Sequence, residues 1–296
     1  MTHIESALIL GGLGQVGGLM ADCLAGAGVE VTYADLGNRP NWLPSPRYLS
    51  ADVTAPDTPL LERIAAAACV VVCLPEEAAL AAAPRVLEAM PDGAVWIDTL
   101  SVKTGICRIL CDCRRNVEML SINPMFAPAL GWRGHPVAVV ELASGVRSAA
   151  FLELLRAQGA TVEMLTADAH DALTATIQVA THAVILAFGT LLLDDDYSME
   201  KRMALATPPH RLLLALLSRI VSSNPEIYWD IQRHHPKGDA VRRKLAHTLR
   251  SLDESPAQFE RLFEQLRARL SPSHDFLKSL GDRIVNEAYQ TPGTIK

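Results

Sequence analysis

Three glycines near the N-terminus have a spacing that suits the binding of a phosphate group. Gly12, Gly14 and Gly17 follow a short apolar run, residues 7–10, and stand at the start of a helical stretch. A G-x-G-x-x-G turn between a strand and a helix lets the backbone approach a pyrophosphate, which then faces the positive end of the helix dipole. The residues expected to contact a dinucleotide are Gly12, Leu13, Gly14, Gln15, Val16 and Gly17. A glycine-rich turn that binds no cofactor is the alternative.

Asp35 is a second feature that points to a dinucleotide. It ends a β-rich run and lies 18 residues after Gly17. A carboxylate there accepts hydrogen bonds from both hydroxyls of the adenosine ribose and repels a 2′-phosphate, so we expect NAD rather than NADP. Arg39 is an opposing feature, because a nearby arginine accommodates NADP. Leu74 and Pro75, at the end of another apolar run, are also expected to line the cofactor site.

An alternation of strands and helices in the first half of the chain places these motifs. Short runs that are apolar throughout are typical of strands in a parallel sheet covered on both faces. The expected strands are residues 7–10, 29–34, 69–74, 94–98, 137–140 and 162–165, and the expected helices are residues 18–26, 58–68, 78–90 and 148–158. We therefore expect an α/β fold, with a Rossmann-type doubly wound parallel sheet as the cofactor-binding domain over residues 1–166.

The second half of the chain shows helical patterns and no strand pattern. The expected helices are residues 170–193, 209–222, 225–234, 239–252 and 256–270. These helices are very apolar for their length, and a second copy of the chain is the simplest cover for them. We expect an all-helical substrate-binding and dimerisation domain over residues 167–296, and a homodimer formed through it.

Composition narrows the class of protein. The chain is 49% hydrophobic, has a net charge of −6 and contains no basic run, so we expect a folded core and no nucleic-acid partner. We find no signal peptide and no run of about 18 uncharged apolar residues, and so expect a cytoplasmic protein without a membrane span. Cys107 and Cys111 share helical spacing, but Cys113 does not and no fourth ligand is adjacent. We expect buried free thiols and no metal.

Further short motifs follow one another in a specific order. They are D-x-x-S-V-K at residues 98–103, Asn-Pro-Met-Phe at 123–126, His-Asp at 170–171 with Gln178 and His182 after it, Pro-His-Arg at 209–211 with Arg219 after it, and Asn-Pro-Glu-Ile-Tyr at 224–228. Over most of its length the chain resembles the prephenate/arogenate dehydrogenase family of aromatic amino acid biosynthesis, which has H-P-M-F at the second of these motifs.

The resemblance implies a reaction in which hydride leaves C4 of a cyclohexadiene ring for NAD and the ring carboxylate departs as carbon dioxide. Ser101 is then expected beside the nicotinamide and the C4 substituent. Gln178 and His182, one turn apart on a helix, are expected to line the substrate pocket. The structural alternatives are a helix N-cap for Ser101 and a core position for His182.

Arg219 is the expected clamp for a substrate carboxylate, because a guanidinium binds a carboxylate bidentately. It lies on an apolar helical stretch, where an unpaired arginine would be costly to bury. A structural ion pair is the alternative, and Arg211 is expected to be structural.

Asn123 departs from the family pattern, which has histidine there as the base that helps deprotonate a C4 hydroxyl. An asparagine carbonyl can accept a hydrogen bond but cannot act as a general base near neutral pH. Losing such a base typically costs about 10²–10⁴ in rate. A C4 amino group needs no such base, because its lone pair assists hydride loss directly. A branch of the family in specialised metabolism, including antibiotic biosynthesis, uses such a substrate, 4-amino-4-deoxyprephenate, and forms 4-aminophenylpyruvate.

Three other interpretations stay open. The first is ordinary prephenate or arogenate oxidation with another base, for which His135 is the nearest downstream histidine. The second is a β-hydroxyacid type of dehydrogenase, whose helical domain supplies a lysine; Lys201 is the candidate, but its segment is polar. The third is an NAD-binding regulator without catalysis. Turnover of a panel of cyclohexadienes with NAD distinguishes them.

Overall fold

The computed structural model describes residues 3–194 and 196–290, which form two compact units. The first unit extends to Thr174 and includes His234–Pro236, whereas the second comprises Ala175–Arg233 and begins again at Lys237. The division falls after residue 166, where the sequence placed the domain limit. The reason is that helix α6 (Ala167–Thr174) buries His170 and Asp171 within the first unit.

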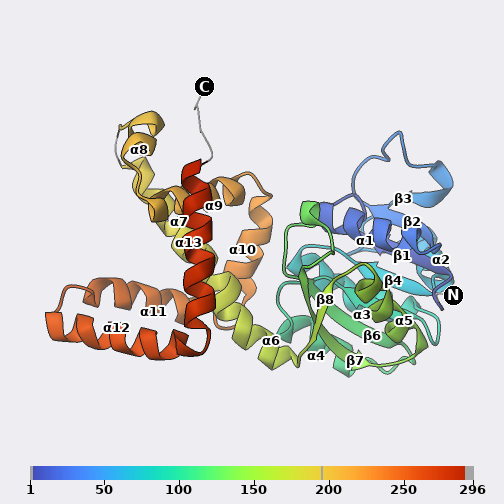
Figure 1. Cartoon of the computed structure of the whole chain (residues 1–296). Coiled ribbons are helices and arrows are strands. Elements are labelled where there is room, and N and C mark those ends of the chain that lie inside the picture. The colour runs from blue at the N-terminus through green and yellow to red at the C-terminus, as the bar shows by residue number, and fades with distance from the viewer. Residues whose placement is uncertain (1–2, 195, 291–296) are drawn as a thin grey trace. The chain divides into compact units, whose positions relative to one another are not determined.

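The first unit is built on one eight-stranded sheet (Figure 1). Its strands are β1 (Ser6–Leu10), β2 (Glu30–Asp35), β3 (Tyr48–Ser50), β4 (Cys69–Val72), β5 (Val95–Asp98), β6 (Glu118–Pro124), β7 (Pro136–Ala143) and β8 (Thr161–Met164), in the order β3-β2-β1-β4-β5-β6-β7-β8. The order reverses between β1 and β4. In open α/β sheets, ligands bind outside the carboxyl ends of the strands at such a switch point.

The sheet is mostly parallel, as expected for a Rossmann-type doubly wound sheet, and one pair of strands departs from this pattern. Strand β7 runs antiparallel to β6, and β8 runs parallel to β7. Only a short segment with one 3-10 turn, Pro128–Leu130, joins β6 to β7. Parallel neighbours are usually joined by a crossover helix of a dozen or more residues, and the connection between β6 and β7 contains no such helix. Strands β3 and β6 were not expected from the sequence.

Helices cover both faces of this sheet, as the continuously apolar strands predicted. Alternation along the strands points Leu8 and Trp96 to one face and Ile9 and Ile97 to the other, and all four are buried. The first face packs against α2 (Thr58–Ala66), α3 (Glu76–Ala89) and α4 (Thr104–Asp112). The second packs against α1 (Gln15–Gly26) and α5 (Val146–Ala157).

The second unit is helical throughout its described part. It contains a π-helical turn (Ala175–Ala180), α7 (Thr181–Thr190), α8 (Met199–Leu205), α9 (Pro208–Val221), α10 (Pro225–His234), α11 (Gly238–Ser251), α12 (Pro256–Leu270) and α13 (His274–Gln290). Helix α9 packs against α7 and α13. The expected helix 170–193 is therefore a continuous run that changes its winding at the π-turn, and α4, α8 and α13 were not expected.

One apolar helical run corrects the sequence argument about membrane spans. By length and composition Ala167–Leu193 could cross a membrane, with a mean hydropathy of 1.8 over its most apolar window. Residues 172–193 contain threonine, glutamine and histidine but no Asp, Glu, Lys or Arg. The core helix of a soluble protein meets the same criteria of length and composition, so this one helix is weak evidence for a membrane.

Candidate functional site

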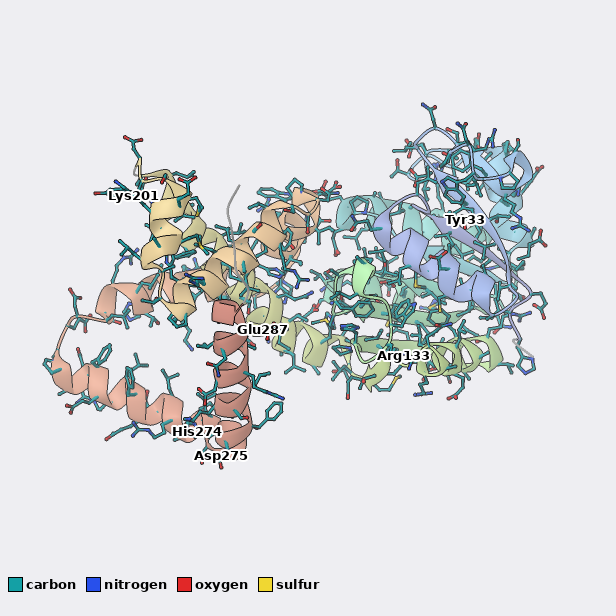
Figure 2. The ribbon with its side chains drawn as sticks, turned by 45° about the horizontal axis from the view of Figure 1, so that its top comes forward. Tyr33, Arg133, Lys201, His274, Asp275 and Glu287 are labelled. Atoms are coloured by element: carbon teal, nitrogen blue, oxygen red, sulfur yellow. The ribbon has the colours of Figure 1, made fainter. Side chains whose placement is uncertain are left out.

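The glycine loop has the shape that a pyrophosphate-binding turn requires. A Cβ on Gly12 would lie 2.6 Å from Cδ1 of Tyr33, the β2 side chain labelled in Figure 2. A Cβ on Gly17 would lie 2.4 Å from the backbone oxygen of Gly11, so glycine is needed for α1 to pack against the loop. At Gly14 the nearest atom to such a Cβ lies 3.4 Å away, which leaves the backbone open to a ligand.

Asp35 at the end of β2 is fixed beside this loop. Its two carboxylate oxygens accept hydrogen bonds from the backbone N–H of Leu13 at 3.0 Å and of Gly37 at 3.2 Å. The Arg39 guanidinium donates to the carbonyl of Leu43 instead of turning to Asp35. The geometry suits a dinucleotide whose adenosine ribose meets a carboxylate.

Leu74 and Pro75 follow β4 at the switch point, on the other side of the glycine loop. A Cβ on Gly11, whose φ is +78°, would lie 3.0 Å from Cδ2 of Leu74. Pro75 is the N-cap residue of α3. The loops after β1 and β4 therefore lie against each other where a doubly wound sheet binds its ligand.

Asp98 and Lys103, which flank Ser101 in the sequence, form a buried ion pair. This pair was not predicted from the sequence. The Lys103 ammonium lies 3.4 Å from Oδ1 of Asp98 and donates to the carbonyls of Leu100 and Ile122, both at 2.7 Å. Burial lowers the pKa of Lys103, and the Asp98 carboxylate opposes that shift. Asp98 also accepts from the Ser121 hydroxyl at 2.7 Å. Together these contacts tie β5, the following loop and β6 into one rigid edge.

Ser101 lies in the bend between β5 and α4 and is half-buried. The N-cap of α4 is Lys103, so the alternative of an N-cap role for Ser101 is wrong. Among the described residues its hydroxyl has no hydrogen-bond partner. The register of β5 and β6 pairs Asp98 with Ser121, so Ser101 and Asn123 both follow that pair at the carboxyl edge of the sheet.

Asp171 caps α4 from outside the helix. Its carboxylate accepts from the backbone N–H of Lys103 at 3.0 Å and of Thr104 at 2.9 Å, and from the Thr104 hydroxyl at 2.5 Å. Its other partner is Nδ1 of His170, 2.8 Å away. Burial alone would raise the pKa of this carboxyl, but these donors hold it below its usual value. Asp171 is therefore ionised.

Asn123 is buried at the end of β6 and pairs with Ala138 of β7. Its Nδ2 lies 3.1 Å from Nε2 of His170, which is fully buried. Burial lowers the pKa of His170, and the hydrogen bond with Asp171 opposes that shift only in part. His170 and Asp171 were seen only as the start of the helical half. The signal that could have assigned them a role is a histidine next to an aspartate at the start of a long, mostly apolar helical run.

The second unit holds three of the expected substrate residues. Gln178 lies in the π-turn and His182 in α7, so the two are not separated by a regular α-helical turn. The His182 ring stacks edge-on against Tyr228 of α10, with centroids 4.9 Å apart. Burial lowers the pKa of His182, and its Nδ1 is buried without a hydrogen-bond partner among the described residues.

Arg219 lies exposed in the last turn of α9. The argument that an apolar helix makes its burial costly therefore does not hold, because the guanidinium faces solvent in the single chain. Within the described ranges it has no ion-pair partner, so the structural ion pair is also absent there. Arg211 donates to the carbonyl of Met203 at 3.0 Å.

The residues behind the alternative interpretations lie as follows. His135 precedes β7, stacks on Phe126 at 5.0 Å and has a buried Nδ1 without a partner among the described residues. Lys201, labelled in Figure 2, is exposed on α8 with its ammonium 6.0 Å from the ring of Tyr197.

The cysteines are free, and they are less buried than expected. Burial raises the pKa of the Cys107 thiol to about 12, whereas Cys111 is exposed and Cys113 is partly buried. In the part of the chain that the structure describes, no group of three His, Cys, Asp or Glu side chains is arranged to hold a metal ion.

The fold and the loop geometry define a Rossmann-type dehydrogenase with a separate helical unit. The family model described as "Prephenate dehydrogenase, dimerization domain" matches residues 166–268. The 4-amino-4-deoxyprephenate dehydrogenase of Streptomyces pristinaespiralis is 37% identical over 94% of this chain and 95% of its own length. The chain therefore belongs to the prephenate dehydrogenase family, as the motif order indicated.

Solved structures agree on the fold. The prephenate dehydrogenase of Aquifex aeolicus, in complex with hydroxyphenyl propionate and NAD+, is 16% identical with a TM-score of 0.61, covering 95% of this chain and 97% of that one. The arogenate dehydrogenase of Synechocystis is 17% identical with a TM-score of 0.59, covering 90% and 99%.

Proposed function

We propose that this protein oxidatively decarboxylates 4-amino-4-deoxyprephenate to 4-aminophenylpyruvate with NAD. Asn123 carries the proposal, because it is an amide where the family has a base, and it is held in a polar buried network and not in a collapsed site. The S. pristinaespiralis relative, which spans almost the whole chain, is named for that activity. Prephenate or arogenate oxidation is the alternative, and a regulator without catalysis is a further one.

The residues of the first unit fit NAD. The open backbone at Gly14, the dipole of α1 and the carboxylate of Asp35 suit a pyrophosphate and an adenosine ribose, with Leu74 and Pro75 beside them. NAD supplies the acceptor for the hydride. Titration should show at least tenfold tighter binding of NAD than of NADP, about 1.4 kcal/mol. Equal affinity would refute the assignment of Asp35 to the ribose.

The amino substituent makes a general base unnecessary. As the C4 hydrogen leaves with its electron pair, the nitrogen lone pair forms a C4=N bond. The C1–carboxylate bond then breaks, carbon dioxide departs, and its electrons complete the aromatic ring and restore a neutral amine. No proton leaves the nitrogen. Ser101 and the Asn123 carbonyl are the proposed acceptors for the amine N–H groups, and Gln178, His182 and Arg219 the proposed residues for the rest of the substrate.

The test is formation of NADH from both substrates. Wild type should use 4-amino-4-deoxyprephenate at least tenfold more efficiently than prephenate, about 1.4 kcal/mol in transition-state binding. Asn123→His should shift the preference toward prephenate. Asn116→His, at an exposed position two residues before the start of β6, is the matched control and should leave the preference unchanged. A wild-type preference for prephenate would overturn the proposal.

The amine must bind in its neutral form, because an ammonium ion has no lone pair to donate. Activity with the amino substrate should therefore rise with pH as the bound ammonium loses its proton. Prephenate, whose hydroxyl does not titrate in this range, should not show the same rise. A pH-independent rate for the amino substrate would contradict this mechanism.

We further propose a cytoplasmic homodimer in which residues 1–166 bind the cofactor and residues 167–296 bind substrate and a second copy. On α12, Phe259, Phe263, Leu266 and Leu270 follow one another at helical spacing and are all exposed. Light scattering should show a dimer at micromolar concentration. Phe263→Glu should weaken the dimer, whereas Gln265→Glu, on the same helix, should not. A monomeric wild type would refute the dimer.

A further inference from the structure

The hydrogen-bonding roles along the buried row Asp171–His170–Asn123 are fixed by chemistry. Asp171 is ionised and accepts at every contact, so the Nδ1 of His170, 2.8 Å away, must carry a proton. In a neutral imidazole Nε2 is then a bare acceptor. Only the NH2 group of Asn123 can donate to an acceptor at 3.1 Å, so the amide nitrogen faces His170.

His170 stays neutral because its surroundings oppose a charge. The ring is fully buried, and burial lowers its pKa. The charged groups that face it are Asp171 from its own helix, and Lys103 and Asp98 from the β5–α4 segment. The Lys103 ammonium opposes protonation and the two carboxylates favour it, but the net pKa is still lowered. A protonated ring would instead donate from Nε2 and would turn the amide around.

We propose that His170 is a positioning residue that determines substrate specificity through Asn123. Because the amide nitrogen is held by His170, the other arm of the amide, its carbonyl, is the one directed to the C4 substituent. This inference rests on the proposed function, in which Asn123 meets that substituent. An acceptor at that place selects a substituent that donates N–H and that needs no base.

The same arrangement explains how one substitution could restore a base. In Asn123→His, the bare Nε2 of His170 would accept the N–H of the introduced imidazole. The other nitrogen of that imidazole would then keep its lone pair toward the substrate, as a general base requires. The side chain at position 123 therefore selects the substrate, and Asp171 and His170 orient either occupant of that position.

The first test reads the tautomer directly in the substrate-free protein. Nitrogen NMR of His170 at pH 8 should show a protonated Nδ1 and an unprotonated Nε2. An Nε2-protonated or doubly protonated ring would overturn the proposal. This result does not depend on which substrate the enzyme prefers, so it separates failure of this inference from failure of the proposed function.

The second test compares variants at position 170. His170→Phe removes the acceptor and should lower kcat for the amino substrate at least tenfold, with the Kd for NAD within about twofold of wild type. His170→Gln can offer its side-chain carbonyl to the amide and should recover part of the kcat. His247→Phe, at an exposed position of α11, is the control. Equal kcat in wild type and His170→Phe would refute the positioning role.

The third test uses the double variant. If His170 sets the tautomer of the introduced imidazole, His170→Phe should abolish the gain in prephenate turnover that Asn123→His brings. Should the gain persist undiminished in the double variant, His170 does not position the residue at 123. Where His170→Phe does not fold, His170→Gln in the same pairing and the NMR measurement decide the question.

Discussion

Replacing Lys103 with methionine is predicted to destabilise the first unit strongly. The Lys103 ammonium is fully buried and has three acceptors, namely Oδ1 of Asp98 at 3.4 Å and the carbonyls of Leu100 and Ile122 at 2.7 Å each. Methionine fills nearly the same volume as the lysine stem, so the loss is electrostatic and not a cavity. Lys103→Met leaves a buried carboxylate without its cation and two buried carbonyls without this donor.

Removing one partner of a buried ion pair typically costs about 3–5 kcal/mol. Trp96 Nε1, the Ser121 hydroxyl and the Leu100 N–H still donate to Asp98, so we expect the lower part of that range. For a domain of this size the melting temperature falls about 2–4 °C per kcal/mol, which gives a drop of about 6–12 °C.

The assay is thermal and urea unfolding of the variant beside wild type. Lys244→Met, at an exposed position of α11, should change the free energy of unfolding by less than about 0.5 kcal/mol. Adding Asp98→Asn to Lys103→Met should recover part of the loss, because it removes the uncompensated charge. If Lys103→Met unfolds within 1 kcal/mol of wild type, roughly the scale of an ordinary point substitution, the buried pair does not have the role given to it here.

Three further outcomes follow from the structure. Gly17→Ala should weaken NAD binding at least tenfold, because the new Cβ would lie 2.4 Å from the backbone oxygen of Gly11. Gly18→Ala is the control and should not weaken it, because no atom lies within 4 Å of its Cβ. Equal titration curves for the two variants would contradict the packing argument. Arg219→Ala should lower the catalytic efficiency and leave the Kd for NAD unchanged, and wild-type kinetics would show that another residue binds the carboxylate. Because the pKa of His170 is lowered in the folded chain, the unfolded chain takes up a proton below about pH 6.5 that the folded chain does not, so the free energy of unfolding should fall as the pH drops from there. The lowered pKa of Asp171 adds a further loss of stability below about pH 3.8. A urea midpoint that is constant from pH 8 to 5 would refute the assignment to His170.

The cofactor loop was predictable from the sequence because its determinants are local. Gly12, Gly14 and Gly17 are needed for a turn and a close approach within a few residues, and the apolar strand before them leaves little choice of element. The direction of β7 was not predictable, because the apolar pattern of a strand is the same whichever way it runs. Strand β6 was missed because Ser121 and Asn123 interrupt its apolar pattern, and both are buried through hydrogen bonds.

The roles of His170 and Lys103 depend on contacts between distant residues. His170 lies 47 positions from Asn123 in the sequence, and only the fold brings the two side chains into contact. Lysine side chains are rarely buried in proteins, so the residue type alone predicts an exposed Lys103. Ser101 was given an N-cap alternative since Ser often caps helices, but Asp171, 67 positions after Thr104, supplies that cap. The apolar character of its helical stretch predicted a buried Arg219, but the average composition of a helix does not tell which of its sides is exposed.

Two carboxylates organise the edge of the sheet at which the proposed chemistry takes place. Asp98 and Lys103 join β5 to β6, and Asp171 caps α4 directly after the Ser101 bend while it holds His170 against Asn123. Since His170 offers a bare acceptor, either an amide or an imidazole at position 123 can donate to it without any change behind that position. The identity of one side chain can therefore exchange a general base for a carbonyl acceptor, and so a hydroxyl substrate for an amino one, while the surrounding fold and its hydrogen bonds stay as they are.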